Sequence, residues 1–260
     1  MIMMQSNRFL SIIMAAFLIV AISIPVSAAE DTSEEFFISA TEMENAQIRV
    51  VDKDLITITN TTIDDNNTVA THSTDSSDQI KSVDITTIAL MVTDSEDTED
   101  LYNDLLRAAN NNNSYKTKGA CGLTIHTRVY YTTQTKDGSD WYKLIRVEGG
   151  NDKSNASNVI GSGFVIKKQS VAYGVWGRNL EGISPVTHTW SATKNLTNTA
   201  TSFNINVTSL HSTWPTISEF QSVLGATYTV IIHSVRSGND TTLELVNNPL
   251  CSVDFPAPFG

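Results

Sequence analysis

Cysteine and histidine are the side chains of this sequence with the widest chemical range. Cys121 lies in a Gly-Ala-Cys-Gly segment, and a distant histidine acting as a base could in principle activate its thiol as a nucleophile. One cysteine and a choice of scattered histidines is a weak pattern, because catalytic motifs do not transfer on residue type alone. The sequence also lacks a His-Glu-x-x-His helix, a Gly-x-Ser-x-Gly elbow and a phosphate-binding glycine loop. We therefore predict no catalytic residues, no metal site and no cofactor.

The two cysteines have a simpler interpretation as a pair. Cys121 and Cys251 are the only cysteines, and they bracket the second half of the chain. In an exported protein, two lone cysteines favour a disulfide bond. We predict this bond, with two buried thiols as the alternative.

Large aromatic side chains gather in the same half of the chain. Exposed rings can stack on sugars or lie at a membrane interface, although most large aromatic residues are buried in a core. We expect at most two of the tryptophans to be exposed. The candidate contact residues are Trp141, Trp176, Trp190 and Trp214.

The element that must position these residues is a hairpin between Cys121 and Glu148. Apolar and β-branched residues occupy alternate positions from Leu123 to Tyr131, with polar residues between them. This period of two is typical of a strand with one buried face. Asp137-Gly138 supplies the turn, because glycine accepts positive φ without steric cost.

Further segments with strand periodicity follow the hairpin. Alternation recurs from Phe203 to Val207 and from Tyr228 to Ile232, and turn residues separate the segments. About seven or eight strands are expected between Cys121 and Val246, without intervening helices. This spacing predicts an all-β domain, an antiparallel β-sandwich of the immunoglobulin-like or jelly-roll-like type.

The preceding part of the chain has a different character. Strand-like runs from Ile48 to Val92 are separated by Asp and Asn clusters and carry few apolar residues, which predicts a thin acidic β-meander. One short helix is expected from Asp94 to Asn110. Its Leu101, Leu105 and Ala108 share a face.

The N-terminus predicts export. One basic residue, Arg8, precedes an apolar run from Phe9 to Ile24, and small residues then fit cleavage after Ala28 or Ala29. These features are typical of a signal peptide over residues 1–28. The alternative is a membrane anchor, but the apolar run is short for a spanning helix. We expect a secreted, extracellular protein.

Charge divides the chain into two parts. Residues 30–104 hold 19 acidic and 3 basic residues, a net of −16, whereas residues 105–260 hold 9 acidic and 13 basic residues, a net of +4. We predict an acidic N-terminal segment over residues 29–118, a candidate pro-region, and a sandwich domain over residues 119–260. Lys116 and Lys118 are the candidate processing sites in an exposed joint. The alternative is one continuous domain whose acidic strands complete the same sheet.

Three function classes follow from these expectations. The first is a secreted, non-catalytic binding protein, whose partner would be a cell-surface polysaccharide, a protein or a membrane surface. The second is an antimicrobial precursor, bacteriocin-like or toxin-like, whose acidic segment masks a membrane-directed domain. The third is an extracellular hydrolase with an unrecognised site. Nucleic acid is excluded as a partner, because a net charge of −11 repels phosphate.

Overall fold

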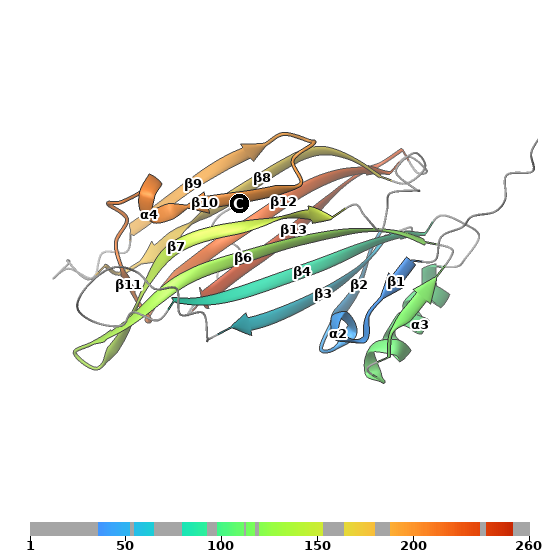
Figure 1. Ribbon diagram of the computed structural model, residues 1–260, viewed down its shortest axis with the longest axis horizontal. Helices are drawn as coiled ribbons and strands as arrows, with labels where there is room; N and C mark the ends of the chain where they lie inside the picture. The colour runs from blue at the N-terminus through green and yellow to red at the C-terminus, as the bar shows by residue number, and fades with distance from the viewer. Residues whose placement is uncertain are drawn as a thin grey trace, which may run out of the picture. The chain divides into compact units, whose positions relative to one another are not determined.

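The described part of the chain is mostly β and forms several antiparallel sheets with three short helices, which confirms the all-β prediction (Figure 1). Residues 35–260 form one compact unit. The predicted signal peptide, with Ala28 and Ala29, lies outside the described residues. The computed structural model describes residues 36–52, 55–64, 80–92, 98–111, 113–117, 120–152, 164–179, 188–234 and 238–251.

The larger sheet is built around the predicted hairpin. Asp137 and Gly138 both have positive φ, at 55° and 80°, so the turn forms where the sequence predicts it. The strand order is β10 (Ser202–Asn206), β7 (Ser139–Asp152), β6 (Ala120–Lys136), β4 (Ile80–Val92), β3 (Leu55–Asp64) and β2 (Gln47–Asp52). The short strand β11 (Ile217–Ser218) also pairs with β7.

The smaller sheet has four strands. Its order is β13 (Asp240–Cys251), β12 (Val223–Ser234), β8 (Phe164–Gly177) and β9 (His188–Leu196). The pairing of β12 with β13 shifts register beside Gly225, and Pro249 lies within the irregular part of β13. A Cβ at Gly225 would lie 2.2 Å from Asn248 Oδ1, so only glycine fits this close approach.

The two sheets contribute to one hydrophobic core. Ile125 and Val129 of β6 belong to the same buried cluster as Leu243 and Leu245 of β13. A polar contact also joins the sheets, because the side-chain amide of Asn247 donates to the carbonyls of Val83 (2.8 Å) and Thr127 (2.9 Å). β13 is thereby fixed to β4 and β6.

Two of the helices, α2 (Ala40–Met43) and α3 (Thr98–Asn110), contact the β2–β3 end of the larger sheet. Leu101, Leu105 and Ala108 are the buried residues of α3, as the sequence predicts, and they pack with Ile56 and Ile58 of β3. The sequence analysis missed α2 and α4 (Val207–Leu210). Each has four residues, too few to show helical periodicity, and each depends on a capping side chain.

The joint between the two predicted parts contains a strand. β5 (Tyr115–Thr117) pairs with β1 (Phe36–Ile38), so the segment expected to be an exposed linker is ordered by pairing. Lys116 is exposed there, whereas Lys118 lies outside the described residues.

Strands β2, β3 and β4 of the acidic segment belong to the same sheet as the strands that follow them. β4 pairs along its whole length with β6, and β3 pairs with β4, so strands from both parts complete one sheet. This pairing matches the single-domain alternative. Cleavage of the acidic segment stays a prediction.

Candidate functional site

The end of the larger sheet formed by β2, β3 and β4 has a hollow on each face. The sequence of β3 explains how the faces differ, because isoleucine and threonine alternate along it. Ile56 and Ile58 point to the helices, on the outer face. Thr57, Thr59 and Thr61 point to the opposite side, which we call the inner face.

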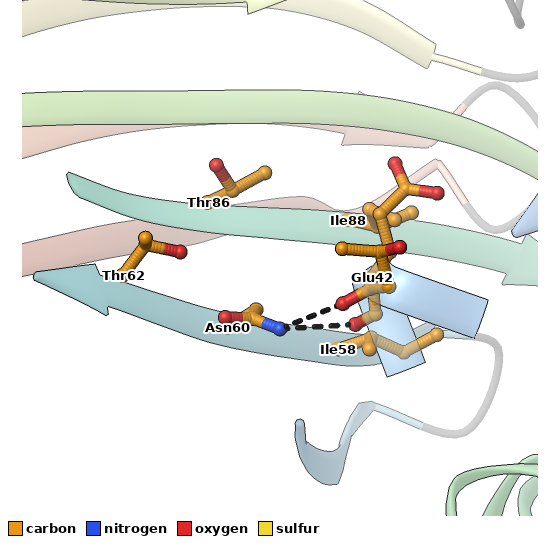
Figure 2. A pocket seen from close by; sticks show the side chains of 7 residues that line it. Glu42, Ile58, Asn60, Thr62, Thr86 and Ile88 are labelled. Atoms are coloured by element: carbon orange, nitrogen blue, oxygen red, sulfur yellow. Dashed lines mark hydrogen bonds between the residues drawn. The ribbon is translucent and has the colours of Figure 1, made fainter. Parts of the chain in front are cut away.

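The outer hollow is small, about 190 Å³, and two of its polar side chains, Asn60 and Glu42, form hydrogen bonds with α2 and its N-cap (Figure 2). The side-chain amide of Asn60 donates to the carbonyls of Glu44 (2.7 Å) and Thr41 (3.2 Å), at the end of α2. The Glu42 carboxylate accepts hydrogen bonds from the backbone N–H (2.8 Å) and the side-chain hydroxyl (2.7 Å) of Ser39. This hollow therefore serves to hold α2 on the sheet.

The inner hollow is larger, about 630 Å³, and lies between the inner face of β2–β4 and strand β13; we call it the inner groove. It exists because β13 packs over β4 and β6, while β2 and β3 continue beyond it. Gln47, Arg49 and Thr61 line this uncovered part with exposed side chains. The groove is thus a gap where the smaller sheet ends before the larger one.

Hydroxyl groups dominate the polar surface of the inner groove. Thr59 Oγ1 and Thr87 Oγ1 lie 2.8 Å apart across β3 and β4, and Arg49 Nη2 donates to Gln47 Oε1 at 3.2 Å. Among the described residues of the lining, Arg49 and Glu244 are the charged side chains, so their formal charges cancel. None of these described residues is aromatic. The described lining therefore offers hydrogen bonding and shape rather than net charge or ring stacking.

Two edge strands border the inner groove. β2 ends the larger sheet and β13 ends the smaller one, so among the described strands neither has a neighbour on its outer side. An edge strand carries backbone N–H and C=O groups that can pair with another extended chain. Val51 and Val246, also in the lining, are apolar and exposed, at 45% and 37%.

The four candidate tryptophans are all partly buried and do not line the inner groove. Trp190 and Trp214 pack against the core. Trp141 lies on β7 opposite Ser218, and Trp176 lies on β8 opposite Val223. The structure therefore does not gather them into one exposed aromatic surface.

Trp214 belongs to a mixed ring cluster. Its indole stacks on the imidazole of His211, with centroids 4.2 Å apart at 11°, and His211 Nε2 lies 3.1 Å from the Tyr173 hydroxyl. Burial raises the pKa of Tyr173 above its ordinary value. Through this cluster the loop after α4 packs against Tyr173 of β8.

The predicted disulfide bond between Cys121 and Cys251 is not supported. Cys121 lies on β6 opposite Met91, and Cys251 lies on β13 opposite Val223, so the cysteines occupy different sheets. No cysteine pair lies at disulfide distance in the described part of the chain, and the side chain of Cys251 is exposed. Bracketing in sequence does not bring strand ends together when each strand is paired within its own sheet.

The histidines are dispersed, and the described residues contain no group of three or more potential metal ligands. His233 Nδ1 lies 2.6 Å from Asp240 Oδ1, and Lys167 Nζ lies 2.9 Å from the same oxygen. The hydrogen bonds from Lys167 and His233 lower the pKa of Asp240 below its ordinary value. All three side chains are substantially accessible, which is the pattern of a surface ion network.

Comparisons with protein-family models, curated proteins and solved structures found no match to this chain. Among the residues that the structure describes, no helix combines the length and apolar character needed to cross a membrane.

The sequence analysis missed the inner groove, although a signal for it was present. Isoleucine and threonine alternate from Ile56 to Thr59, which marks one apolar face and one hydroxyl face on the same strand. The position of β13 decides that the hydroxyl face stays open, and no local pattern encodes that position.

Proposed function

We propose that this chain is a secreted, non-catalytic binding protein, in which the two sheets form a β-sandwich and the ligand lies in the inner groove. The observation that supports this proposal is the accessible polar face of β2 and β3, with Gln47, Arg49 and Thr61, beside the edge of β13. The groove volume of about 630 Å³ falls within the range of roughly 300–1,000 Å³ found for ligand pockets.

The polar lining also favours binding over a purely structural role. Threonine side chains facing the interior of a sheet stack would normally be covered and paired, because unsatisfied buried hydroxyls are costly. Thr61 and Gln47 instead remain exposed on the inner face. A ligand in the groove could use their hydrogen-bonding capacity without any rearrangement of the strands.

The antimicrobial-precursor alternative is less well supported. Its mechanism requires release of the acidic segment, yet β4 pairs with β6 and supplies Val83 and Ala89 to the shared core. A binding protein needs no such release. The hydrolase alternative would need general acid, base or nucleophilic groups converging on a hollow, and the lining of the inner groove offers only Arg49 and Glu244 as charged side chains.

A matched pair of variants tests the proposed site. Thr61 and Thr62 are adjacent, exposed residues on opposite faces of β3, so Thr61→Arg fills the inner groove and Thr62→Arg adds the same bulk and charge outside it. The full chain would be screened for binding to immobilised cell-wall polysaccharides, displayed peptides and phosphatidylglycerol vesicles. We expect at least one ligand class whose binding is lost in Thr61→Arg and kept in Thr62→Arg. Equal effects of the two variants on every bound ligand would remove the inner groove as the site.

A further inference from the structure

We propose that the ligand of the inner groove is an extended peptide segment of a partner protein, which binds by adding a strand to the free edge of β13. This inference rests on the proposed function and specifies its ligand class. The added strand would become the fifth strand of the smaller sheet. It would also cover the inner face of β2 and β3.

The edge of β13 is the better template of the two edges. A strand added to β13 in the plane of the smaller sheet lies over β3 and fills the inner groove, so its side chains and its backbone both gain contacts. A strand added to β2 would extend the larger sheet away from the groove. β2 is also interrupted by a register shift between Val50 and Asp52, which weakens it as a template.

The walls of the groove fit a pleated chain. Thr57, Thr59 and Thr61 line one wall at every second residue, with Thr57 buried, Thr59 half-buried and Thr61 exposed, and residues 242–246 of β13 form the other wall. Each wall spans five residues, about 16 Å at roughly 3.3 Å per strand residue. Alternate side chains of a bound strand therefore face these threonines, which favours small hydroxylated or β-branched residues.

Charge complementarity specifies the strand further. Arg49 faces the groove from β2, whereas Glu244 is exposed on β13, between the buried residues Leu243 and Leu245 that face the core. Neither Arg49 nor Glu244 belongs to an ion pair among the described residues. An added strand would place an acidic residue inward, toward Arg49, and a basic residue outward, beside Glu244.

The lining disfavours the other ligand classes. Sugar rings are commonly held by stacking on aromatic side chains, and the lining has none. Its formal charge of zero gives no attraction for an anionic lipid surface. A peptide needs only backbone pairing and small side-chain contacts, and the groove offers both.

The test selects binders from a displayed library of peptides about seven residues long, in which hydroxylated and β-branched residues alternate around one acidic and one basic residue. Selection uses the full chain, and the Thr61→Arg variant removes binders that do not need the groove. We expect selected peptides to bind the native chain and Thr62→Arg equally, and Thr61→Arg at least about tenfold more weakly. Failure to recover any groove-dependent peptide overturns the inference.

Backbone methylation of the strongest selected peptide then separates strand addition from other binding modes. In a paired strand, alternate N–H groups point to the neighbouring edge, so N-methylation at one set of alternate positions should abolish binding. Methylation at the other set should change affinity less than about threefold. Equal sensitivity at both sets would overturn the edge-pairing mechanism.

Glu244→Lys provides an independent charge test. We expect it to weaken binding of a selected peptide at least about fivefold, and replacement of the outward basic residue of that peptide by glutamate to restore it. No restoration would overturn the placement of the strand beside Glu244. If a polysaccharide shows the Thr61→Arg effect while no peptide does, the proposed function stands and the peptide inference fails; if no ligand shows it, both fail.

Discussion

The outer and inner faces of the β2–β4 end of the larger sheet use the same strands for different purposes. On the outer face, α2 and α3 cover isoleucine and leucine side chains, and the residues there form a second buried cluster. On the inner face, no strand covers β2, and threonine, glutamine and arginine side chains line a groove. One face stabilises the sheet and the other is available to a ligand.

Polar groups on the two faces differ in the same way. Asn60 and Glu42 on the outer face use their hydrogen-bonding atoms to hold α2. On the inner face, Thr59 and Thr87 bind each other, but Thr61 and Gln47 lie exposed. Polar residues alone therefore do not mark a binding surface; the informative feature is polar capacity that the fold leaves accessible.

Removal of strands β2, β3 and β4, which carry both faces, should have the largest effect on folding. A chain starting at Gly119 lacks β2, β3 and β4, so β6 becomes an edge and the core loses Leu55, Val83 and Ala89. We expect this fragment to lack cooperative thermal unfolding and near-ultraviolet circular dichroism, in contrast to the full chain.

Limited trypsin digestion of the full chain tests the predicted processing joint. If trypsin cuts near Lys116 and leaves a folded C-terminal fragment, the acidic segment is separable and is not needed to complete the sheet. The full chain, tested under the same conditions without trypsin, is the control.

Among single substitutions, shortening a buried side chain on the outer face should lower stability most. Ile58 is 1% exposed within the outer cluster, and Ile58→Ala should lower the free energy of unfolding by about 2–5 kcal/mol. Ile63→Ala makes the same change on the same strand, at a side chain that is 65% exposed, and should cost less than about 0.5 kcal/mol. Urea denaturation measures both. Similar losses would contradict the assignment of the two positions.

The contact that fixes β13 beside the groove should rank next. Asn247→Ala leaves the carbonyls of Val83 and Thr127 without these buried donors, and we expect a loss of about 1–3 kcal/mol in urea denaturation. Because Asn247 holds β13 over β4 and β6, the variant should also bind any ligand of the inner groove more weakly. Unchanged stability would mean that packing alone positions β13.

The amide that holds α2 should have a smaller effect. Asn60→Ala removes donors to the carbonyls at the end of α2, one of which is only 2.7 Å away, and should cost about 1 kcal/mol because this site is partly exposed. Hydrogen exchange should speed up in α2 and leave β6 unchanged. Faster exchange in β6 would show that α2 supports more of the sheet than the contacts indicate.

Local patterns predicted most of the elements. The hairpin turn at Asp137-Gly138 and the buried face of α3 follow from residue type and period, and both are confirmed. The short helix α2 was missed, because its stability comes from the Ser39 capping box and from Asn60, a residue distant in sequence.

Long-range arrangement was the part that the sequence could not provide. The charge difference between the two parts of the chain suggested a boundary, yet β4 pairs with β6 because strand pairing depends on apolar face and register rather than on net charge. The disulfide prediction also lacks support, because no cysteine pair among the described residues lies at disulfide distance and local patterns do not tell how far apart the ends of β6 and β13 lie. The inner groove depends on where β13 ends the smaller sheet, which no single strand encodes.

The smallest effect on stability is expected at Thr61 on the inner face, whose neighbour Thr62 lies on the outer face. Thr61 is exposed on the inner face, so Thr61→Val should change the free energy of unfolding by less than about 0.5 kcal/mol in urea denaturation. The substitution keeps the shape of the side chain and the β-branching that suits a strand, and removes only the hydroxyl. A ligand that hydrogen-bonds to this hydroxyl should nevertheless bind several-fold more weakly, by about 0.5–1.5 kcal/mol. Thr62→Val makes the identical change on the outer face and should affect neither quantity. A stability loss above 1 kcal/mol in Thr61→Val, measured against this control, would show that the inner face is structural after all.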